Sequence, residues 1–98
     1  MTREEAEQAV AELSGWSLSE DGRAIRKEWL VRDFVEGLRF FQAVGELAEA
    51  EGHHPDLHLE KYRHVTIVLW THAVGGLSEN DFILAAKIDQ IPVTLKSN

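Results

Sequence analysis

Histidines are concentrated in one short stretch of this chain. All five histidines of the 98-residue sequence lie between positions 53 and 72, as His53, His54, His58, His64 and His72. Imidazole gives and takes protons near neutral pH, because its unperturbed pKa lies in that range. The stretch therefore indicates a site that transfers protons, and the surroundings of each histidine narrow down which of them could form it.

The main candidates are the adjacent pair His53-His54 and the more distant His72. The pair follows a predicted helix end, where the helix dipole favours a protonated imidazole, and Pro55 holds His54 extended. His72 comes at the end of a predicted strand, where a small sheet can project reactive groups into a cleft. The pair could instead cap the helix by bonding to its free carbonyl groups. At this point the residues leave both interpretations open.

A zinc site is the main alternative use of these histidines. Adjacent histidines rarely chelate one ion, because neighbouring side chains diverge in extended backbone. The other candidate ligands have no i, i+4 spacing on one helix, and the sequence contains no cysteine. The glycine pair Gly75-Gly76 lacks the flanking pattern of a phosphate- or dinucleotide-binding loop. We therefore predict no metal and no nucleotide here, and we interpret His58 and His64 as solvated strand residues.

The composition sets wider limits on function. The formal net charge of −7 and the sequence pI near 5.1 argue against a nucleic-acid-binding protein, which needs a basic face. No apolar run approaches a membrane span, and the acidic start Met1-Thr2-Arg3-Glu4-Glu5 is the opposite of a signal peptide. We expect a single cytoplasmic domain over residues 1–98, with neither a membrane nor a nucleic acid as its partner.

The elements that must position these residues begin with a short helix over 2–14. Thr2 and Glu5 form a T-x-x-E capping box at its start, and apolar residues follow at helical spacing. An Asp-Gly turn between two runs of alternating residues then predicts a hairpin. Its two short strands are predicted over 16–19 and 24–31.

A long helix is predicted over 34–51, where Asp33 and Glu36 have the spacing of a capping box. One face of this helix collects most of its apolar residues, namely Phe34, Leu38, Phe41, Val44, Gly45 and Ala48. Phe40 and Leu47 lie well off that face, so the apolar arc covers half of the circumference or more. The surplus could be a deep core contact or a subunit interface, and in so small a domain we favour the interface.

Two further strands and a last helix complete the chain. The strands are predicted over 57–60 and 63–72, and the helix over 79–91, with Ser78 as its cap. Asp81 matches an S-x-x-D cap, so a purely structural role is open for it. The order helix, two strands, helix, two strands, helix predicts an α+β domain, with a four-stranded, mainly antiparallel sheet and its helices packed on one face.

A spaced pattern of polar and aromatic residues covers the histidine stretch. Glu49 is followed after three residues by His53-His54-Pro55, after six more by Tyr62, after nine by His72 and after eight by Asp81. This pattern resembles the signature of the pterin-4a-carbinolamine dehydratases, and every element falls at an allowed spacing. The segment that runs from Thr71 through a glycine pair to Ser78 is similar to one in the same family. The resemblance spans nearly the whole chain.

This resemblance implies a hydro-lyase. Family members remove water from 4a-hydroxytetrahydropterin and give quinonoid dihydropterin, with no metal or other cofactor. The carry-over implies that His54 and His72 are the acid/base residues and that His53 contacts or polarises the pterin. It implies that Asp81 and Glu49 are carboxylates that orient an imidazole. Contacts with the pterin are further implied for Pro55, Tyr62 and Thr71.

The resemblance also implies the α+β fold and homodimers that pair into tetramers through helices. One departure is the spacing before Tyr62, which is six residues rather than five. Some chains of this type do other work, since one branch looks like a partner of transcription factors. Another branch resembles an assembly factor for the carbon-fixing carboxylase, RuBisCO. The alternative to the enzyme is therefore a catalytically weak protein that binds a protein partner, and the complete set of histidines favours the enzyme.

Overall fold

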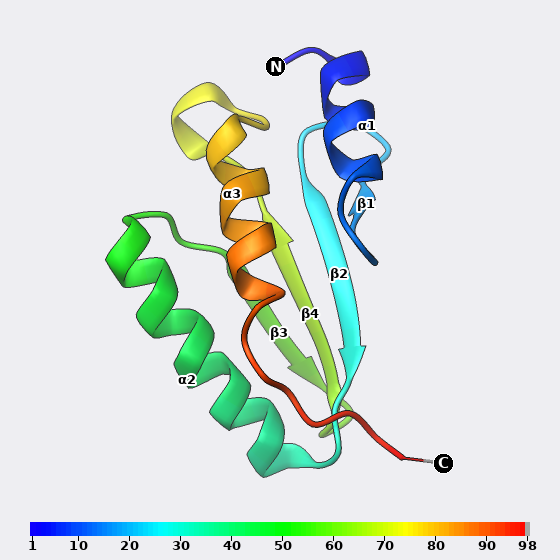
Figure 1. Ribbon diagram of the computed structural model, residues 1–98, viewed down its shortest axis with the longest axis vertical. Helices are drawn as coiled ribbons and strands as arrows, with labels where there is room; N and C mark the ends of the chain where they lie inside the picture. The colour runs from blue at the N-terminus through cyan, green and yellow to red at the C-terminus, as the bar shows by residue number, and fades with distance from the viewer. Residues whose placement is uncertain (98) are drawn as a thin grey trace.

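The computed structural model of the chain describes residues 1–97. Its elements in chain order are α1 (Arg3–Ala11), β1 (Ser17–Leu18), β2 (Ile25–Leu30), α2 (Phe34–Glu51), β3 (Asp56–Glu60), β4 (His64–Leu69), the short 3₁₀ helix η1 (His72–Val74) and α3 (Glu79–Ile88). The predicted order of helices and strands is confirmed, and η1 is an addition to it (Figure 1). No helix within the described residues is long and apolar enough to cross a membrane.

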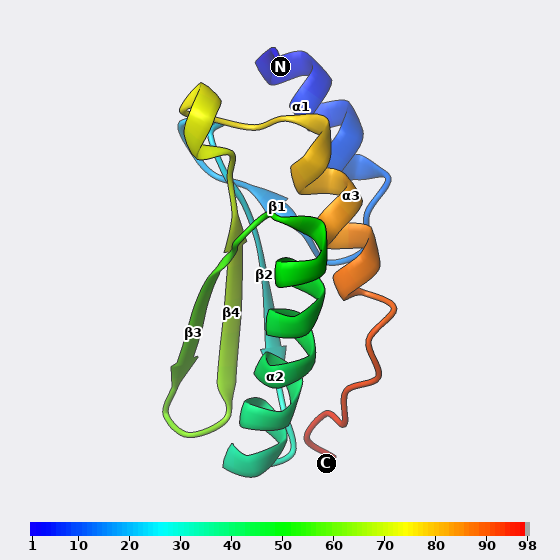
Figure 2. The same cartoon turned by 90° about the vertical axis from the view of Figure 1, so that its left-hand side faces the viewer.

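The four strands form one antiparallel sheet in the order β1-β2-β4-β3. Side chains alternate between the two faces of a sheet, and Ile25, Ile67 and Leu69 are fully buried on one of them. The three α-helices lie against this face and leave the opposite face uncovered (Figure 2). The predicted α+β class, with helices on one face of a four-stranded sheet, is confirmed.

Several elements end earlier than the sequence predicts. α1 ends at Ala11 and α3 at Ile88, and both helices close with tighter turns. The N–H groups of Glu12 and Leu13, and those of Gln90 and Ile91, bond to the carbonyl three residues back instead of four. β4 ends at Leu69, because Thr71 forms an isolated bridge across the η1 turn. The predicted strand over 63–72 was therefore too long, and His72 begins η1 instead of ending a strand.

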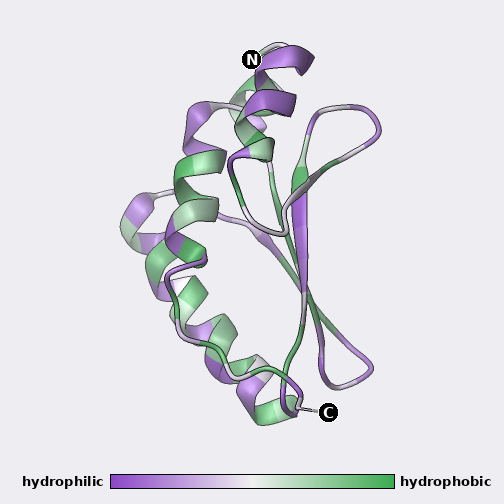
Figure 3. Ribbon diagram, turned by 45° about the vertical axis from the view of Figure 1, so that its right-hand side comes forward, coloured by the Kyte–Doolittle hydropathy of each residue, from purple (hydrophilic) through white to green (hydrophobic). Residues whose placement is uncertain are grey.

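The face of α2 that packs on the sheet matches the predicted apolar face only in part, since it shares Val44 and Ala48 with that face. The non-polar residues buried along it are Gly37, Phe40, Val44 and Ala48. Phe34 and Leu38, which also belong to the predicted apolar face, are 48% and 49% exposed. Gly37 permits the close approach, because a Cβ there would lie 3.0 Å from Cδ1 of Leu59 on β3. α2 thus has a buried and an exposed apolar stripe. Figure 3 shows hydrophobic and hydrophilic residues alternating along the helices.

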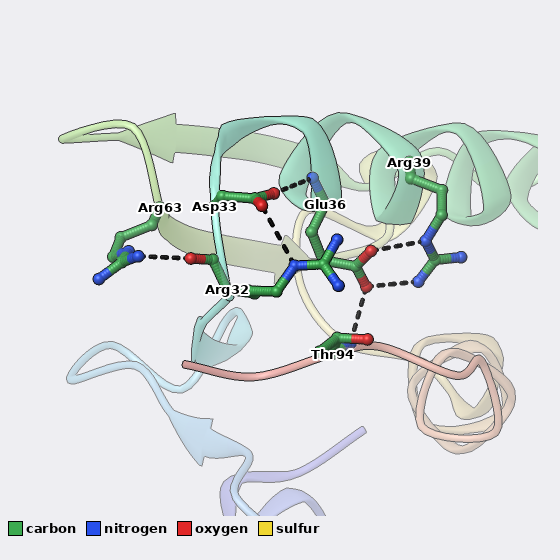
Figure 4. Close-up of polar contacts among 6 residues, drawn as sticks. All are labelled: Arg32, Asp33, Glu36, Arg39, Arg63 and Thr94. Carbon is green, nitrogen blue, oxygen red and sulfur yellow. Dashed lines mark hydrogen bonds and ion pairs between the residues drawn. The ribbon is translucent and has the colours of Figure 1, made fainter. Parts of the chain in front are cut away.

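The predicted capping box at the start of α2 is only half correct. Asp33 does cap the helix, since its carboxylate accepts the backbone N–H of Glu36 at 2.9 Å. The Glu36 carboxylate turns away from the cap and is buried, with its side chain 4% exposed. It accepts two hydrogen bonds from Arg39, at 2.8 and 2.6 Å, and one from the backbone N–H of Thr94 at 2.7 Å (Figure 4).

These contacts fasten the C-terminal segment 92–96 to the start of α2 and the end of β2. Arg39 also donates to the carbonyl of Pro92 at 2.7 Å. Val31 and Leu95 form an isolated antiparallel bridge, and the backbone N–H of Lys96 donates to the carbonyl of Leu30 at 2.9 Å. A charged pair and backbone hydrogen bonds therefore hold the N-terminal end of α2, far along the helix from Glu49 at its other end.

Candidate active site

The candidate site lies where the C-terminal end of α2, the exit from β4 and the N-terminal end of α3 come together (Figures 1 and 2). Gly52 ends α2 in the left-handed region, with φ of 64° and ψ of 28°, a conformation that glycine adopts without steric cost. The backbone N–H groups of Gly52 and His53 bond to the last carbonyl groups of α2. The helix is therefore capped by backbone groups, and the two histidine side chains remain free for other partners.

His53 pairs with a buried carboxylate of α3. Its Nε2 lies 2.6 Å from Oδ1 of Asp81, whose side chain is 0% exposed, while the His53 side chain is 16% exposed. The Asp81 carboxylate also accepts the backbone N–H of Ser78 at 3.0 Å, which is the S-x-x-D cap that the sequence predicts. The structural and the functional interpretation of Asp81 are thus compatible, because different oxygens serve the two contacts.

Two hydroxyl groups complete the surroundings of Asp81. The Thr71 hydroxyl donates to Oδ2 of Asp81 at 2.7 Å, and the Oγ atoms of Thr71 and Ser78 are 2.7 Å apart. The sequence suggested Ser78 only as a helix cap and Thr71 only as a contact for the pterin. The signal that could have linked them is their spacing, since one residue leaves β4 and the other begins α3 around the η1 turn.

His54 pairs with the second predicted carboxylate. Its Nε2 is in hydrogen-bond contact with Oε2 of Glu49, near the end of α2. Both side chains are open to solvent, with 66% and 77% of their surfaces exposed. No hydrogen bond within residues 1–97 joins the ring of His53 or His54 to a helix carbonyl, so both imidazoles pair with carboxylates instead of capping α2.

His72 is exposed at the start of η1. Its ring lies edge to face with Trp70, with the centroids 5.3 Å apart and the planes at 67°. The residue before it, Thr71, bonds to Asp81, which places His72 one residue from the hydrogen-bond network of His53. The structure therefore brings the three predicted histidines to one end of the sheet and gives two of them a carboxylate partner.

Tyr62 does not join this group within one chain. It lies in the turn between β3 and β4, at the end of these strands away from η1 (Figure 2). Its backbone has a φ of 54°, and the Arg63 guanidinium carbon lies 4.9 Å from its ring centroid. His58 and His64 are exposed on the uncovered face of the sheet. Within residues 1–97, no three side chains of the metal-ligating types are close enough together to hold an ion.

Fold and site together define a small α+β domain that holds two histidine–carboxylate pairs and a third histidine beside one end of an antiparallel sheet. The family model for pterin 4 alpha carbinolamine dehydratase matches residues 1–91 of the chain. An Arabidopsis thaliana protein, pterin-4-alpha-carbinolamine dehydratase 2, mitochondrial, is 50% identical over 95 residues, which are 95% of this chain and 51% of that protein. A Halorhodospira halophila protein, provisionally named a pterin-4-alpha-carbinolamine dehydratase, is 45% identical over 91 residues, covering 93% of this chain and 83% of that protein.

Two solved structures have a similar fold. A transcriptional coactivator/pterin dehydratase from Brucella melitensis superposes with a TM-score of 0.82 at 31% identity, covering 91% of this chain and 94% of the other. A pterin dehydratase-like protein, identified as a RuBisCO assembly factor in the alpha-carboxysome, gives a TM-score of 0.64 at 21% identity, covering 78% and 87%, and shows likeness of fold alone. The chain belongs to the pterin-4-alpha-carbinolamine dehydratase family, a family of hydro-lyases. It spans about half the length of the Arabidopsis relative (51%).

Proposed function

We propose that the chain removes water from 4a-hydroxytetrahydropterin to give quinonoid dihydropterin, by histidine acid/base catalysis and without a metal or other cofactor. The observation that carries the proposal is the hydrogen bond between His53 and the buried Asp81, beside the exposed His54 and His72. Membership of the dehydratase family supports the class of substrate. The three imidazoles supply the proton-transferring groups that such a reaction needs.

The chemistry divides into two proton transfers. Hydroxide is a poor leaving group, so an acid must protonate the 4a-oxygen as the C–O bond breaks and water departs. The electron pair of a ring nitrogen moves toward C4a, and the proton of a ring N–H then passes to a base. His54 and His72 are our candidates for these two roles, because both rings are exposed and can reach a bound pterin. We assign His53, whose Nε2 already faces Asp81, as the polarising contact.

The proposed binding residues differ in how well their positions suit a contact with the pterin. Glu49 and Pro55 lie beside the histidine pair and support the proposal by their location. Thr71 is the third proposed contact, and its hydroxyl already donates to Asp81. Tyr62 lies at the other end of β3 and β4, and a pterin at the histidines would meet it only from another copy of the chain.

The test is the rate at which purified protein removes the 4a-hydroxy intermediate, followed by absorbance with a metal chelator present. We expect His54→Ala and His72→Ala to lower kcat/KM by about 10²-fold or more, as loss of a general acid or base does. His64→Ala is the matched control, because His64 lies on the uncovered face of the sheet. Normal turnover in both site variants would refute histidine catalysis.

A second candidate function is that of a catalytically weak protein that binds a protein partner, such as an assembly factor for RuBisCO. The observation in its favour is the likeness of fold to the RuBisCO assembly factor. The paired histidines favour the enzyme, because a protein that only needs the fold has no use for imidazole–carboxylate pairs at one site. A rate at background level, together with a stable complex between the chain and the carboxylase, would support this second function.

We also propose that the chain forms homodimers or homotetramers. The exposed apolar stripe on α2 supports this, since Phe34, Val35 and Leu38 are 48%, 70% and 49% exposed. Light scattering measures the mass directly. The cytoplasmic location predicted from the sequence stays a prediction, because Arabidopsis relatives are named as mitochondrial and chloroplastic proteins.

A further inference from the structure

We propose that Thr71 is a positioning residue: its hydroxyl, which is in contact with the hydroxyl of Ser78, holds the Asp81 carboxylate so that His53 carries its proton on Nε2 and keeps the lone pair of Nδ1 free. The importance of this arrangement for turnover rests on the proposed function. The arrangement itself is a property of the folded protein and can be tested without any substrate. It also gives Thr71 a different role from the pterin contact that the family resemblance implies.

The proposal follows from counting hydrogens. Oδ2 of Asp81 accepts the Thr71 hydroxyl at 2.7 Å and the backbone N–H of Ser78 at 3.0 Å. A hydroxyl group has a single hydrogen, and that of Thr71 is used on Asp81. In the 2.7 Å contact between the two hydroxyl groups, Ser78 must therefore be the donor. The hydrogen bonds run in one direction, from Ser78 to Thr71 and from Thr71 to the carboxylate.

The same count fixes the proton on His53. An ionised carboxylate only accepts hydrogen bonds, so the 2.6 Å contact between Nε2 of His53 and Oδ1 of Asp81 needs a hydrogen on Nε2. A neutral imidazole has one N–H, and the partner of one nitrogen decides which nitrogen holds it. Nδ1 is then the basic atom of the neutral ring. Because Asp81 is 0% exposed and His53 only 16%, water competes little for this hydrogen bond.

The Thr71 hydroxyl matters because it helps to determine how the carboxylate is turned. Thr71 and the Ser78 backbone both bond to Oδ2, which directs Oδ1 at the imidazole. Without the Thr71 hydroxyl, Oδ2 keeps one hydrogen bond from the backbone, and the carboxylate can rotate about its last bond. A carboxylate that turns in this way holds the Nε2 hydrogen less firmly, and the second tautomer of His53 becomes populated.

The experiment measures the ring ¹⁵N chemical shifts of His53 in the full chain, at a pH where the ring is neutral. We expect the wild type to give the pattern of an Nε2–H imidazole. Thr71→Val removes the hydroxyl at nearly constant shape and should move both ring nitrogens toward averaged values, whereas Thr71→Ser should restore the wild-type pattern. Thr66→Val is the matched control, since it removes a hydroxyl from the uncovered face of β4, the strand that precedes Thr71, and should change nothing at His53.

The kinetic effect should follow the same order. Loss of one hydrogen bond to a charged group should lower kcat about tenfold in Thr71→Val, with KM changed less, and Thr71→Ser should recover the rate. An unchanged Nε2–H pattern in a folded Thr71→Val protein would overturn the proposal, and so would an Nδ1–H pattern in the wild type. Should the valine variant fail to fold, Thr71→Ala removes the same hydroxyl with less bulk, and the same two outcomes decide. An inactive wild type with the expected ¹⁵N pattern would contradict the proposed function alone.

Discussion

Replacement of Glu36 by glutamine should destabilise the fold by an amount that depends on pH. The Glu36 carboxylate is buried beneath the C-terminal segment and accepts hydrogen bonds from Arg39 and from the backbone of Thr94 (Figure 4). These hydrogen bonds, with Arg39 the largest cause, lower the pKa of Glu36 from 4.5 to about 2. Glutamine keeps the shape and one acceptor, but it loses the charge that these donors stabilise.

The size of the effect follows from the two pKa values of Glu36. The difference between 4.5 and about 2 corresponds to about 3 kcal/mol, at about 1.36 kcal/mol per pH unit. Because the folded pKa is lower than the unfolded one, this stability is fully present above pH 4.5 and is lost as the pH falls through about 2. At pH 3 the same two values leave roughly 1 kcal/mol.

The assay is equilibrium unfolding in urea at pH 7 and pH 3, with all variants at one protein concentration, since association also stabilises a fold. We expect Glu36→Gln to lower the free energy of unfolding by about 3 kcal/mol at pH 7 and by about 1 kcal/mol at pH 3. Glu46→Gln is the matched control, because Glu46 lies exposed on the same helix and should change stability by at most about 0.5 kcal/mol. A loss at pH 7 no larger than that of the control, or equal losses at both pH values, would refute this reasoning.

The same variant should leave turnover nearly unchanged while it is folded. Glu36 and Glu49 are thirteen residues apart on α2, which is about 20 Å at the rise of an α-helix. The far end of the helix is held separately, by Gly52 and by the contact between His53 and Asp81. A clamp at one end of α2 therefore contributes to stability, and we expect a kcat within about twofold of wild type at a temperature well below the unfolding transition.

Three further predictions follow from particular contacts. Gly37→Ala places a Cβ 3.0 Å from Leu59 and should lower the free energy of unfolding by about 1–3 kcal/mol. Gly45→Ala, which has nothing within 4 Å of the new Cβ, should raise it by about 0.5–1 kcal/mol. Urea unfolding measures both variants, and a Gly37→Ala protein more stable than wild type would contradict the prediction. Leu38→Glu puts a charge on the exposed stripe of α2 and should lower the mass found by light scattering, and an unchanged assembly would place the interface elsewhere. Asp81→Asn removes a charged acceptor of three hydrogen bonds and should lower kcat/KM at least about tenfold, which a rate equal to wild type would contradict.

Features that depend on neighbours in the sequence could be predicted for this fold. The T-x-x-E box at Thr2 forms as expected, with both reciprocal hydrogen bonds present. The end of α2 at Gly52 and the antiparallel hairpin of β1 and β2 also follow from short-range signals. Caps, glycine helix ends and alternating strands are decided within a few residues, and for that reason a single sequence reveals them.

Features that depend on distant partners could not be predicted in the same way. Glu36 has the spacing of a capping residue, yet its carboxylate bonds to Thr94, 58 residues further along the chain. Phe40 lies off the most apolar face of α2 in a helical projection, yet it is fully buried. The reason is that α2 has two apolar stripes, and the projection gives no sign of which one meets the sheet. Gly37 lies on the buried stripe, where the missing side chain permits a close approach to Leu59.

The candidate site shows the same division. The spaced pattern identified the three histidines and the two carboxylates, but it did not show which carboxylate bonds to which histidine. One contact joins residues 28 positions apart, and the other crosses the end of α2. Asp81 pairs with His53 over 28 residues, and the same carboxylate accepts the hydroxyl of Thr71, which follows the end of β4. These pairings depend on how α3 docks beside the exit of β4, which the packing of the core determines.

The two histidine–carboxylate pairs differ most in their access to water, and this difference supports separate roles. His53 and Asp81 are 16% and 0% exposed, and the hydrogen bonds around Asp81 hold their geometry fixed. His54 and Glu49 are 66% and 77% exposed, so water and salt screen their attraction and the contact can open and close at little cost. A residue that must exchange protons with a substrate and then with solvent needs the second environment. A residue that must present one ring nitrogen in one protonation state needs the first.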